Sequence, residues 1–253
     1  MQPKVSVVMT VFNRQDYLGQ AVQSVLAQTF PDFELIIVDD GSTDASPLIA
    51  QRFALRDSRI QFEARPHRGR IPALADAMEL ATGDYVGWVD SDDLLEPEAL
   101  AETVRFLERH HHVGLVYTDY LDIDDEGHVL GIGSRCRVPF SHHGLLRTFM
   151  TFHFRLFRRS LFDQIGGLTD AVPMAEDYDF CLRASEVARF GRIRKPLYRY
   201  RKHANRVTDT HRLAQIHGAK EAIRRALARR GLDAQWNLHL ELRGQFELRR
   251  KSS

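Results

Sequence analysis

Three clusters of polar residues each follow an apolar run that is typical of a buried strand. They are Thr10–Arg14 (TVFNR), Asp39–Ser42 (DDGS) and Asp90–Asp93 (DSDD). In an open α/β sheet, ligands bind beyond the carboxyl ends of the strands. One aspartate at a strand end most often forms a turn or caps a helix, but three such clusters on successive strands predict a polar binding site.

The third cluster places Asp90, Asp92 and Asp93 within four residues. A divalent cation would relieve the repulsion between these like charges. Hard oxygen ligands favour Mg²⁺ or Mn²⁺, which take one or two carboxylates and complete their coordination with phosphate oxygens and water. The cluster therefore predicts a divalent metal that holds a diphosphate. The sequence has neither a GxxxxGK[ST] loop nor a GxGxxG run after the first strand, so neither a P-loop NTPase nor a dinucleotide-binding fold is expected.

The first 120 residues alternate strand and helix patterns, and these elements must position the clusters. We expect strands at Val5–Val11, Glu34–Val38, Ile60–Glu63, Tyr85–Val89 and Val113–Asp119. We expect helices at Asp16–Gln28, Ser46–Leu55, Pro72–Ala81 and Pro97–Arg109. This order predicts an α/β fold with a mostly parallel central sheet flanked by helices.

The pattern after residue 120 is less regular. The run IDDEGHVLG (123–131) predicts a hairpin. Helices are expected at Phe154–Phe162 and Asp177–Val187, an edge strand at Ile193–Tyr200 and a basic amphipathic helix at Leu213–Arg230. Residues Trp236–Leu248 fit either a helix or an alternating strand.

The composition is that of an ordinary globular protein. The 253 residues are 43% apolar and 27% charged, and Cys136 and Cys181 are too few for a disulfide framework or a four-thiolate zinc site. No apolar run reaches about 18 residues and the N-terminus lacks the pattern of a signal peptide, so we expect a cytoplasmic protein without a membrane span.

The two parts of the chain carry opposite charge. Residues 1–182 contain 16 Lys and Arg against 28 Asp and Glu, whereas residues 183–253 contain 19 against 6. The basic part could contact an anionic ligand or a membrane surface peripherally, or it could fold back on the acidic part. Charge alone leaves both interpretations open.

Five segments of the sequence resemble the family 2 glycosyltransferases, which are inverting enzymes with the GT-A fold. In the order and spacing of that family they are VSVVMTVFNR, SVLAQTFPDFELIIVDDGSTD, ATGDYVGWVDSDD, AEDYDFCLRA and YRYRKH. The resemblance spans about residues 4–205, and its first 45 residues are especially similar to a bacterial spore-coat type of member. It implies a nucleotide-binding half at residues 1–120, an acceptor-binding half at 121–205 and a basic C-terminal extension at 206–253.

The resemblance implies nucleotide-binding roles for several residues. Those that would hold the base are Thr10, Val11, Asn13, Asp39 and Asp40. A carboxylate at Asp40 would accept the imide N–H of uracil or thymine. Arg70 would lie near the base or the diphosphate, and Asp90, the first residue of the DxD element, would lie near the ribose.

The same resemblance assigns the metal and the catalytic base. Asp92 would bind the cation (Mn²⁺ or Mg²⁺), and His203 would approach the metal or the diphosphate. Asp177 would be the general base and Glu176 would orient the acceptor or the base. Inversion is a single displacement, so the acceptor hydroxyl must lose its proton as it attacks. Acidic residues also favour the first turn of a helix, which is the structural alternative for Glu176 and Asp177.

Three departures from the family pattern qualify these assignments. The family's Asn-x-Gly-x-x-x-Ala-x-Asn pattern is replaced by HRGRIPALAD at residues 67–76, slightly out of register, which leaves Arg68 and Arg70 as alternatives. Arg206 stands where a small hydroxyl residue is frequent. The QxxRW motif and the membrane helices of processive synthases are missing, so we expect transfer of one sugar per encounter.

The sequence therefore predicts a metal-dependent transferase that moves one sugar from a UDP- or dTDP-sugar to a hydroxyl acceptor. The acceptor would be a glycan, a lipid-linked molecule or another hydroxyl compound, in the synthesis of a cell-surface polysaccharide or glycoconjugate; no nucleic-acid partner is expected. A sugar nucleotidyltransferase is one alternative, although no glycine precedes Gly19 to form its glycine-rich loop. A non-catalytic binding module is another, and Asp92 and Asp177 argue against it.

Overall fold

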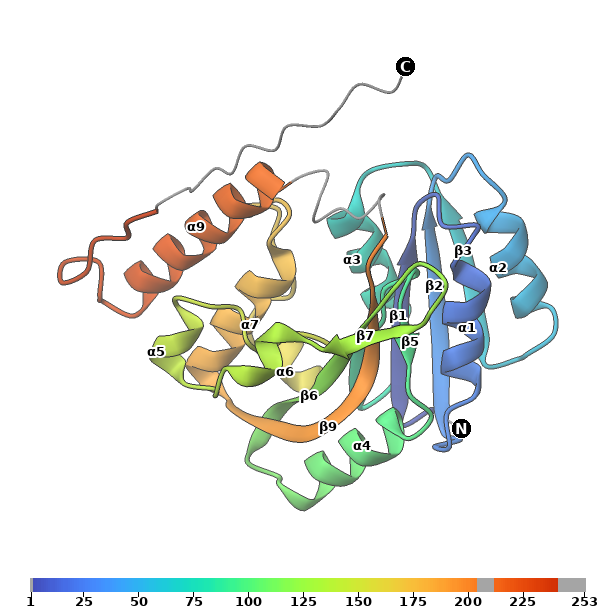
Figure 1. Cartoon of the computed structure of the whole chain (residues 1–253), viewed down its shortest axis with the longest axis horizontal. Helices are drawn as coiled ribbons and strands as arrows, with labels where there is room; N and C mark the ends of the chain where they lie inside the picture. Colours follow the sequence, from blue (N-terminus) through green and yellow to red (C-terminus); the bar gives the residue numbers. More distant parts are fainter. Residues whose placement is uncertain (1, 204–211, 241–253) are drawn as a thin grey trace.

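The computed structural model describes residues 2–203 and 212–240, and a single nine-stranded sheet runs through it (Figure 1). The first half of the sheet has the order β3-β2-β1-β4 with every pair parallel. Its strands are β1 (Val5–Val11), β2 (Phe33–Asp40), β3 (Ile60–Arg65) and β4 (Tyr85–Trp88). Nearly every residue of β1, β2 and β4 is buried, as expected for parallel strands covered on both faces.

Helices cover both faces of the sheet. One hydrophobic core includes residues of α1 (Leu18–Leu26), α2 (Ser46–Ala54) and α4 (Ala99–Arg109). The other includes residues of α3 (Arg70–Leu80), α7 (Glu176–Val187) and α9 (Arg212–Arg229). All six helices lie within about two residues of their predicted bounds.

The second half of the sheet mixes parallel and antiparallel pairs. Its order continues as β4-β8-β6-β9-β5, and β7 pairs with β6 beside this path. The strands are β5 (Leu94–Leu95), β6 (Val113–Ile123), β7 (Val129–Ile132), β8 (Arg155–Arg158) and β9 (Arg189–Arg201). The α/β fold and the hairpin at β6–β7 are confirmed, whereas parallel pairing is confined to the first four strands and to β6–β9.

The predicted helix at Phe154–Phe162 is wrong over its first half. Residues Arg155–Arg158 form β8, which pairs antiparallel with β4 and β6, and only α6 (Arg159–Gln164) is helical. Burial between two strands overrides local helix propensity here. The remaining short helices are η1 (Ser134–Arg137) and α5 (His142–Leu145).

The parallel strands bring the three polar clusters to one edge of the sheet. Val11 at the end of β1 lies opposite Asp39 of β2, and Val8 of β1 lies opposite Trp88 at the end of β4. Strand β2 extends through Asp40, so both of its aspartates belong to the strand rather than to the turn that the sequence suggested.

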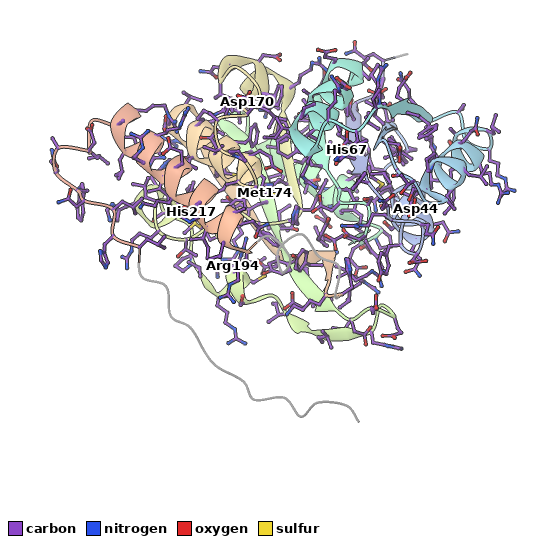
Figure 2. The ribbon with its side chains drawn as sticks, turned by 90° about the horizontal axis from the view of Figure 1, so that it is seen from above. Asp44, His67, Asp170, Met174, Arg194 and His217 are labelled. Atoms are coloured by element: carbon purple, nitrogen blue, oxygen red, sulfur yellow. The ribbon has the colours of Figure 1, made fainter. Side chains whose placement is uncertain are left out.

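The described part of the basic C-terminal region packs on α7. The close contact is at Gly218 of α9, where an added Cβ would lie 2.2 Å from the Pro173 carbonyl oxygen. Figure 2 shows Met174, which precedes α7, beside His217 of α9. This packing confirms the predicted helix and favours the interpretation in which the basic tail folds back on the acidic part.

No helix in the described ranges is both long and apolar enough to cross a membrane. The expected domain boundary at residues 205–206 and the departure at Arg206 lie outside the described residues. So does most of the ambiguous segment Trp236–Leu248, of which residues 236–240 form neither helix nor strand.

Candidate active site

The loops after β1 and β2 are bound to each other through Asn13. Its backbone N–H donates to the Ser42 hydroxyl at 2.9 Å, and its side-chain oxygen accepts the Thr43 N–H at 2.8 Å. Asn13 has a φ of +52°, a left-handed conformation that asparagine tolerates better than most residues. Thr10 and Val11 lie just before it at the end of β1.

The two aspartates at the end of β2 face this loop pair. Asp40 is 4% exposed and accepts the backbone N–H groups of Arg68 at 2.7 Å and Gly69 at 2.9 Å. Asp39 accepts the Ser42 N–H at 2.9 Å, while its second oxygen is buried with no hydrogen-bond partner among the described residues. A carboxylate has about four acceptor positions, so both aspartates retain capacity for a ligand's donor.

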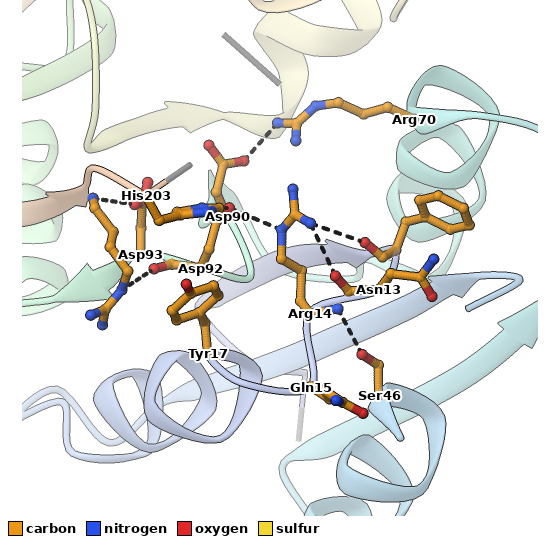
Figure 3. Close-up of polar contacts among 12 residues, drawn as sticks. Asn13, Arg14, Gln15, Tyr17, Ser46, Arg70, Asp90, Asp92, Asp93 and His203 are labelled. Atoms are coloured by element: carbon orange, nitrogen blue, oxygen red, sulfur yellow. Dashed lines mark hydrogen bonds and ion pairs between the residues drawn. The ribbon is translucent and has the colours of Figure 1, made fainter. Parts of the chain in front are cut away.

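Arg70 connects the DxD segment to the start of α7. Its guanidinium lies 2.7 Å from Asp90 Oδ1 (Figure 3) and 2.8 Å from Glu176 Oε1. Arg70 is the first residue of α3 and Glu176 the first of α7, so this bridge joins three elements that are far apart in the sequence. Arg68 instead pairs with Asp76, so of the two alternatives it is the Arg70 side chain that contacts the DxD segment.

Burial and the charges of this network shift the pKa values of its members. Burial alone would raise the pKa of Asp90, but the positive charges of Arg70 and Arg155 hold that pKa below its usual value. Burial raises the pKa of Glu176, even though Arg70 opposes the shift. The charge of Asp90 raises the pKa of Arg70 and keeps it a cation. The bridge therefore carries a fixed positive charge between two acidic segments.

His153 also contacts Asp90, with its Nε2 3.3 Å from Oδ2. Its ring stacks on Tyr198 of β9 at 4.9 Å between centroids. Burial lowers the pKa of His153 to about 4, although the charge of Asp90 acts in the opposite direction. The imidazole is therefore neutral at physiological pH.

The side chains of Asp92 and His203 contact each other. His203 Nε2 lies 3.0 Å from Asp92 Oδ2, and the His203 side chain is 1% exposed (Figure 3). Adjacent ligands of an octahedral ion with bonds of about 2.1 Å lie about 3.0 Å apart. A carboxylate oxygen and an imidazole nitrogen at this spacing fit two neighbouring ligands of Mn²⁺ or Mg²⁺.

Asp93 is an anchor rather than a ligand candidate. Its carboxylate accepts the Tyr198 hydroxyl at 2.9 Å and the backbone N–H of Arg201 at 2.7 Å. Burial and the charges of Asp92 and Asp90 raise its pKa well above the usual value. These bonds attach the DxD segment to β9, the strand that leads to His203.

Asp177 lies beside Glu176 but in a different setting. Its side chain is 24% exposed against 8% for Glu176, and its Oδ2 lies 3.4 Å from the guanidinium of Arg155. Arg155 is 2% exposed and also donates to the Thr151 carbonyl oxygen at 3.0 Å. Asp177 is thus the more accessible carboxylate of the pair and has a buried cation next to it.

Two other features lie outside this network. A hollow of about 1040 Å³ at the amino ends of β1 and β4 is lined by Lys4, Asp84 and Arg158, among others, and by none of the predicted site residues. Asp124, Glu126 and His128 gather at the β6–β7 turn with ligand atoms within 4.8 Å of one another. They are exposed or half-buried, so this acidic turn does not by itself make a metal site.

The structure thus links five of the predicted residues by direct contacts, in two groups: Arg70 with Asp90 and Glu176, and Asp92 with His203. Asp177 adjoins Glu176, and the predicted base-binding residues lie in the neighbouring loops. Sequence reasoning gave no role to Arg14, His153 and Arg155. Arg14 is part of the TVFNR cluster, and Arg155 lies in the segment that was wrongly predicted as a helix, whereas no sequence pattern singled out His153.

Comparisons with known proteins identify the family of this chain. A family model described as glycosyl transferase family 2 matches residues 6–166. Chondroitin synthase of Escherichia coli is 33% identical over 196 residues, which cover 78% of this chain but only 28% of that protein. The chain therefore spans less than a third of the length of this relative.

Solved glycosyltransferase structures share the fold. S. aureus TarS 1–349 in complex with UDP-GlcNAc has a TM-score of 0.69 at 21% identity, covering 89% of this chain and 72% of that TarS 1–349 chain. The mannosyltransferase PcManGT of Pyrobaculum calidifontis, in complex with GDP-Man and Mn²⁺, has a TM-score of 0.67 at 22% identity, covering 90% and 65%. The sheet and its flanking helices are those of the GT-A fold. With the family model matching well over half of its length, the chain belongs to glycosyltransferase family 2.

Proposed function

We propose that this chain transfers a single sugar from a UDP- or dTDP-sugar to an acceptor hydroxyl, with inversion at the anomeric carbon. The observation that carries the proposal is the Arg70 bridge between Asp90 and Glu176. It holds the DxD segment, where the donor would bind, against the start of α7, where Asp177 lies. TarS with UDP-GlcNAc and PcManGT with GDP-Man, which share the fold, support a nucleotide-sugar donor.

The donor's base would lie against the loops after β1 and β2. Asp40 and Asp39 would accept its N–H group, and Thr10, Val11 and Asn13 would shape the loop that contacts it. Asp90 would lie near the ribose. Residues 1–120 would thus form the nucleotide-binding half and residues 121–205 the acceptor-binding half.

Asp92 and His203 would hold a divalent cation, for which their 3.0 Å spacing is suitable. When bound there, the cation would supply positive charge to stabilise the departing nucleoside diphosphate. PcManGT in complex with Mn²⁺ supports this choice of cofactor.

Asp177 would accept the proton of the acceptor hydroxyl as its oxygen attacks the anomeric carbon. The new carbon–oxygen bond forms as the bond from that carbon to the diphosphate oxygen breaks, so the proton ends on Asp177 and the negative charge on the diphosphate. Glu176, which is bonded to Arg70, would orient the acceptor or Asp177 rather than take the proton itself.

The biological context is proposed from the relatives. Chondroitin synthase suggests synthesis of a cell-surface polysaccharide or glycoconjugate, with a glycan or lipid-linked acceptor. We further propose a cytoplasmic location, with peripheral membrane contact through the basic C-terminal extension (206–253).

A donor panel with Mn²⁺ tests this function. Purified protein is incubated with UDP-, dTDP- and GDP-sugars, and both thermal shift and release of the nucleoside diphosphate are measured. We expect stabilisation and slow hydrolysis with a uracil or thymine donor, and loss of both on chelation. Conversion of the nucleotide sugar and labelled pyrophosphate into a labelled nucleoside triphosphate and a sugar 1-phosphate would instead indicate a nucleotidyltransferase and would contradict the proposal.

Replacement of the proposed base sharpens the test. Asp177→Asn removes the proton acceptor and leaves the nucleotide loops intact, so turnover should fall at least about a hundredfold while UDP affinity changes little. Asp163→Asn, on α6, is the matched control and should turn over normally. Retained turnover in Asp177→Asn would overturn the assignment of the base.

A further inference from the structure

Arg14 forms an ion pair with Asp92, the carboxylate that would bind the metal. Its Nε lies 3.0 Å from Asp92 Oδ2, the same oxygen that His203 Nε2 approaches at 3.0 Å. The side chains of Arg14 and Asp92 are only 17% and 18% exposed. Figure 3 shows the guanidinium lying between the end of β1 and the Asp90–Asp93 segment. Asp92 is thus paired with a cationic side chain at the same oxygen that His203 approaches.

The loop after β1 holds Arg14 in this place. Its Nη1 donates to the Asn13 carbonyl oxygen at 3.0 Å and to the Phe12 carbonyl oxygen at 3.4 Å. Its backbone N–H donates to the Ser46 hydroxyl at 2.8 Å. The guanidinium is therefore directed at Asp92 by its own loop as well as by charge.

A divalent cation at Asp92 and His203 cannot coexist with Arg14 in this position. Two cations on one carboxylate oxygen repel each other strongly where water screens them little. Metal binding therefore requires the guanidinium to leave Asp92. The neighbouring carboxylates are engaged: Asp90 is paired with Arg70, and Asp93 is bonded to Tyr198 and Arg201.

The donor's diphosphate is the anion that the displaced guanidinium would meet. Arginine binds phosphate oxygens through two parallel N–H donors. Arg14 follows β1 and lies beside the DxD segment. We propose that Arg14 exchanges Asp92 for the donor's diphosphate when the metal binds, and thereby couples metal binding to donor binding. This inference rests on the proposed function, because it needs a diphosphate donor and a metal at Asp92.

The exchange predicts two measurable effects on the binding of the metal and the diphosphate. Without nucleotide, the metal must displace Arg14, so removing the guanidinium should tighten metal binding. With a diphosphate present, the guanidinium gains a new partner, so the metal and the diphosphate should each strengthen the binding of the other by the same factor. That mutual factor should shrink when Arg14 is neutral.

The test measures Mn²⁺ affinity by electron paramagnetic resonance, with and without saturating UDP. Compared are the wild type, Arg14→Gln, Arg14→Lys, and Arg59→Gln as a control whose ion pair with Asp57 lies elsewhere. For Arg14→Gln we expect Mn²⁺ alone to bind about five- to tenfold more tightly, and the enhancement by UDP to fall by at least that factor. Arg59→Gln should resemble the wild type. Arg14→Lys, which keeps the charge but not the two parallel N–H donors, should lie between the wild type and Arg14→Gln. UMP, which lacks the second phosphate, should give little enhancement in any of the proteins.

The result for Arg14→Gln decides the inference. Unchanged or weaker binding of Mn²⁺ alone, or an unchanged enhancement by UDP, would overturn it. Asp92→Asn separates this failure from a failure of the proposed function. If Asp92→Asn binds Mn²⁺ normally, the metal assignment itself is wrong; if it loses Mn²⁺ while Arg14→Gln behaves as the wild type, only the exchange is wrong. If UDP binds to none of the proteins, the affinity of Arg14→Gln for Mn²⁺ alone, compared with that of the wild type, still decides whether Arg14 competes with the metal.

Discussion

At the scale of single residues, three carboxylates of the site each pair with a different arginine. Asp90 is paired with Arg70, Asp92 with Arg14 and Asp177 with Arg155. Burying a charge without a partner is costly. Asp93 has hydrogen bonds but no ion pair among the described residues, and burial and the charges of Asp92 and Asp90 raise its pKa. His153 follows the same rule for a base, because its burial favours the neutral ring.

The lowered pKa of His153 predicts a loss of stability in acid. The unfolded value is 6.5 and the folded value about 4, so between these pH values the unfolded chain binds a proton that the folded chain excludes. Stability should therefore fall by about 3 kcal/mol as the pH drops through this window. Urea unfolding of the wild type and His153→Gln at pH 4–7.5 measures this, and the variant should show a shallower fall.

The exposed His217 on α9 provides the matched control. His217→Gln should keep the slope of the wild type. If His153→Gln also kept that slope, the acid sensitivity would have another source and the buried neutral imidazole would not explain it.

At the scale of elements, close approach of β1 and the segment before β4 keeps the strand ends aligned. The contact occurs at Gly83, where an added Cβ would lie 2.7 Å from the backbone nitrogen of Ser6. Gly83 N–H also donates to the Ser6 hydroxyl at 2.8 Å. A side chain there would push apart the two strands whose carboxyl ends carry Asn13 and Asp90.

Two glycine-to-alanine substitutions should therefore have opposite effects on stability. Gly83→Ala should destabilise by about 1–3 kcal/mol, because the backbone it meets cannot yield easily. Gly19→Ala in α1 meets nothing within 4 Å and should stabilise by about 0.5–1 kcal/mol through helix propensity. Chemical denaturation measures both, and equal effects of the two substitutions would refute the steric argument.

At the scale of the whole molecule, two arginines at the C-terminal end of α9 attach this helix to α7. Arg230, just after α9, donates to the Leu182 carbonyl oxygen, the Ser185 hydroxyl at 2.9 Å and the Glu186 carboxylate. Arg229 pairs with the same Glu186 at 2.9 Å. The proposed membrane contact must therefore use other basic residues of this region.

Arg230 should contribute to stability through these contacts. Arg230→Ala should cost about 1–2 kcal/mol, because it removes the hydrogen bond to the buried Ser185 hydroxyl together with the contacts to Leu182 and Glu186. Arg225→Ala removes an ion pair that is internal to α9, with a side chain 43% exposed, and should cost less than about 0.5 kcal/mol. Urea denaturation distinguishes the two, and an equal cost would mean that α9 does not depend on Arg230 to stay on α7.

The sequence by itself determined the alternation of strands and helices and the edge at which the polar clusters gather. Both follow from local periodicity and from the rule that parallel strands end on one side of a sheet. Asp90 and Asp92 were singled out by their place after a predicted strand, whereas Glu176 and Asp177 were proposed only through the resemblance to the family.

Only the tertiary structure decided which side chains are partners. Arg14 and Asp92 are 78 residues apart, and His153, two residues before β8, lies beside Asp90, which is far from it in the sequence. Arg68 and Arg70 are two residues apart, yet Arg70 contacts Asp90 and Arg68 contacts Asp76. Local patterns report whether a residue is buried, but pairing between distant charges depends on how the elements pack, and no periodicity records that.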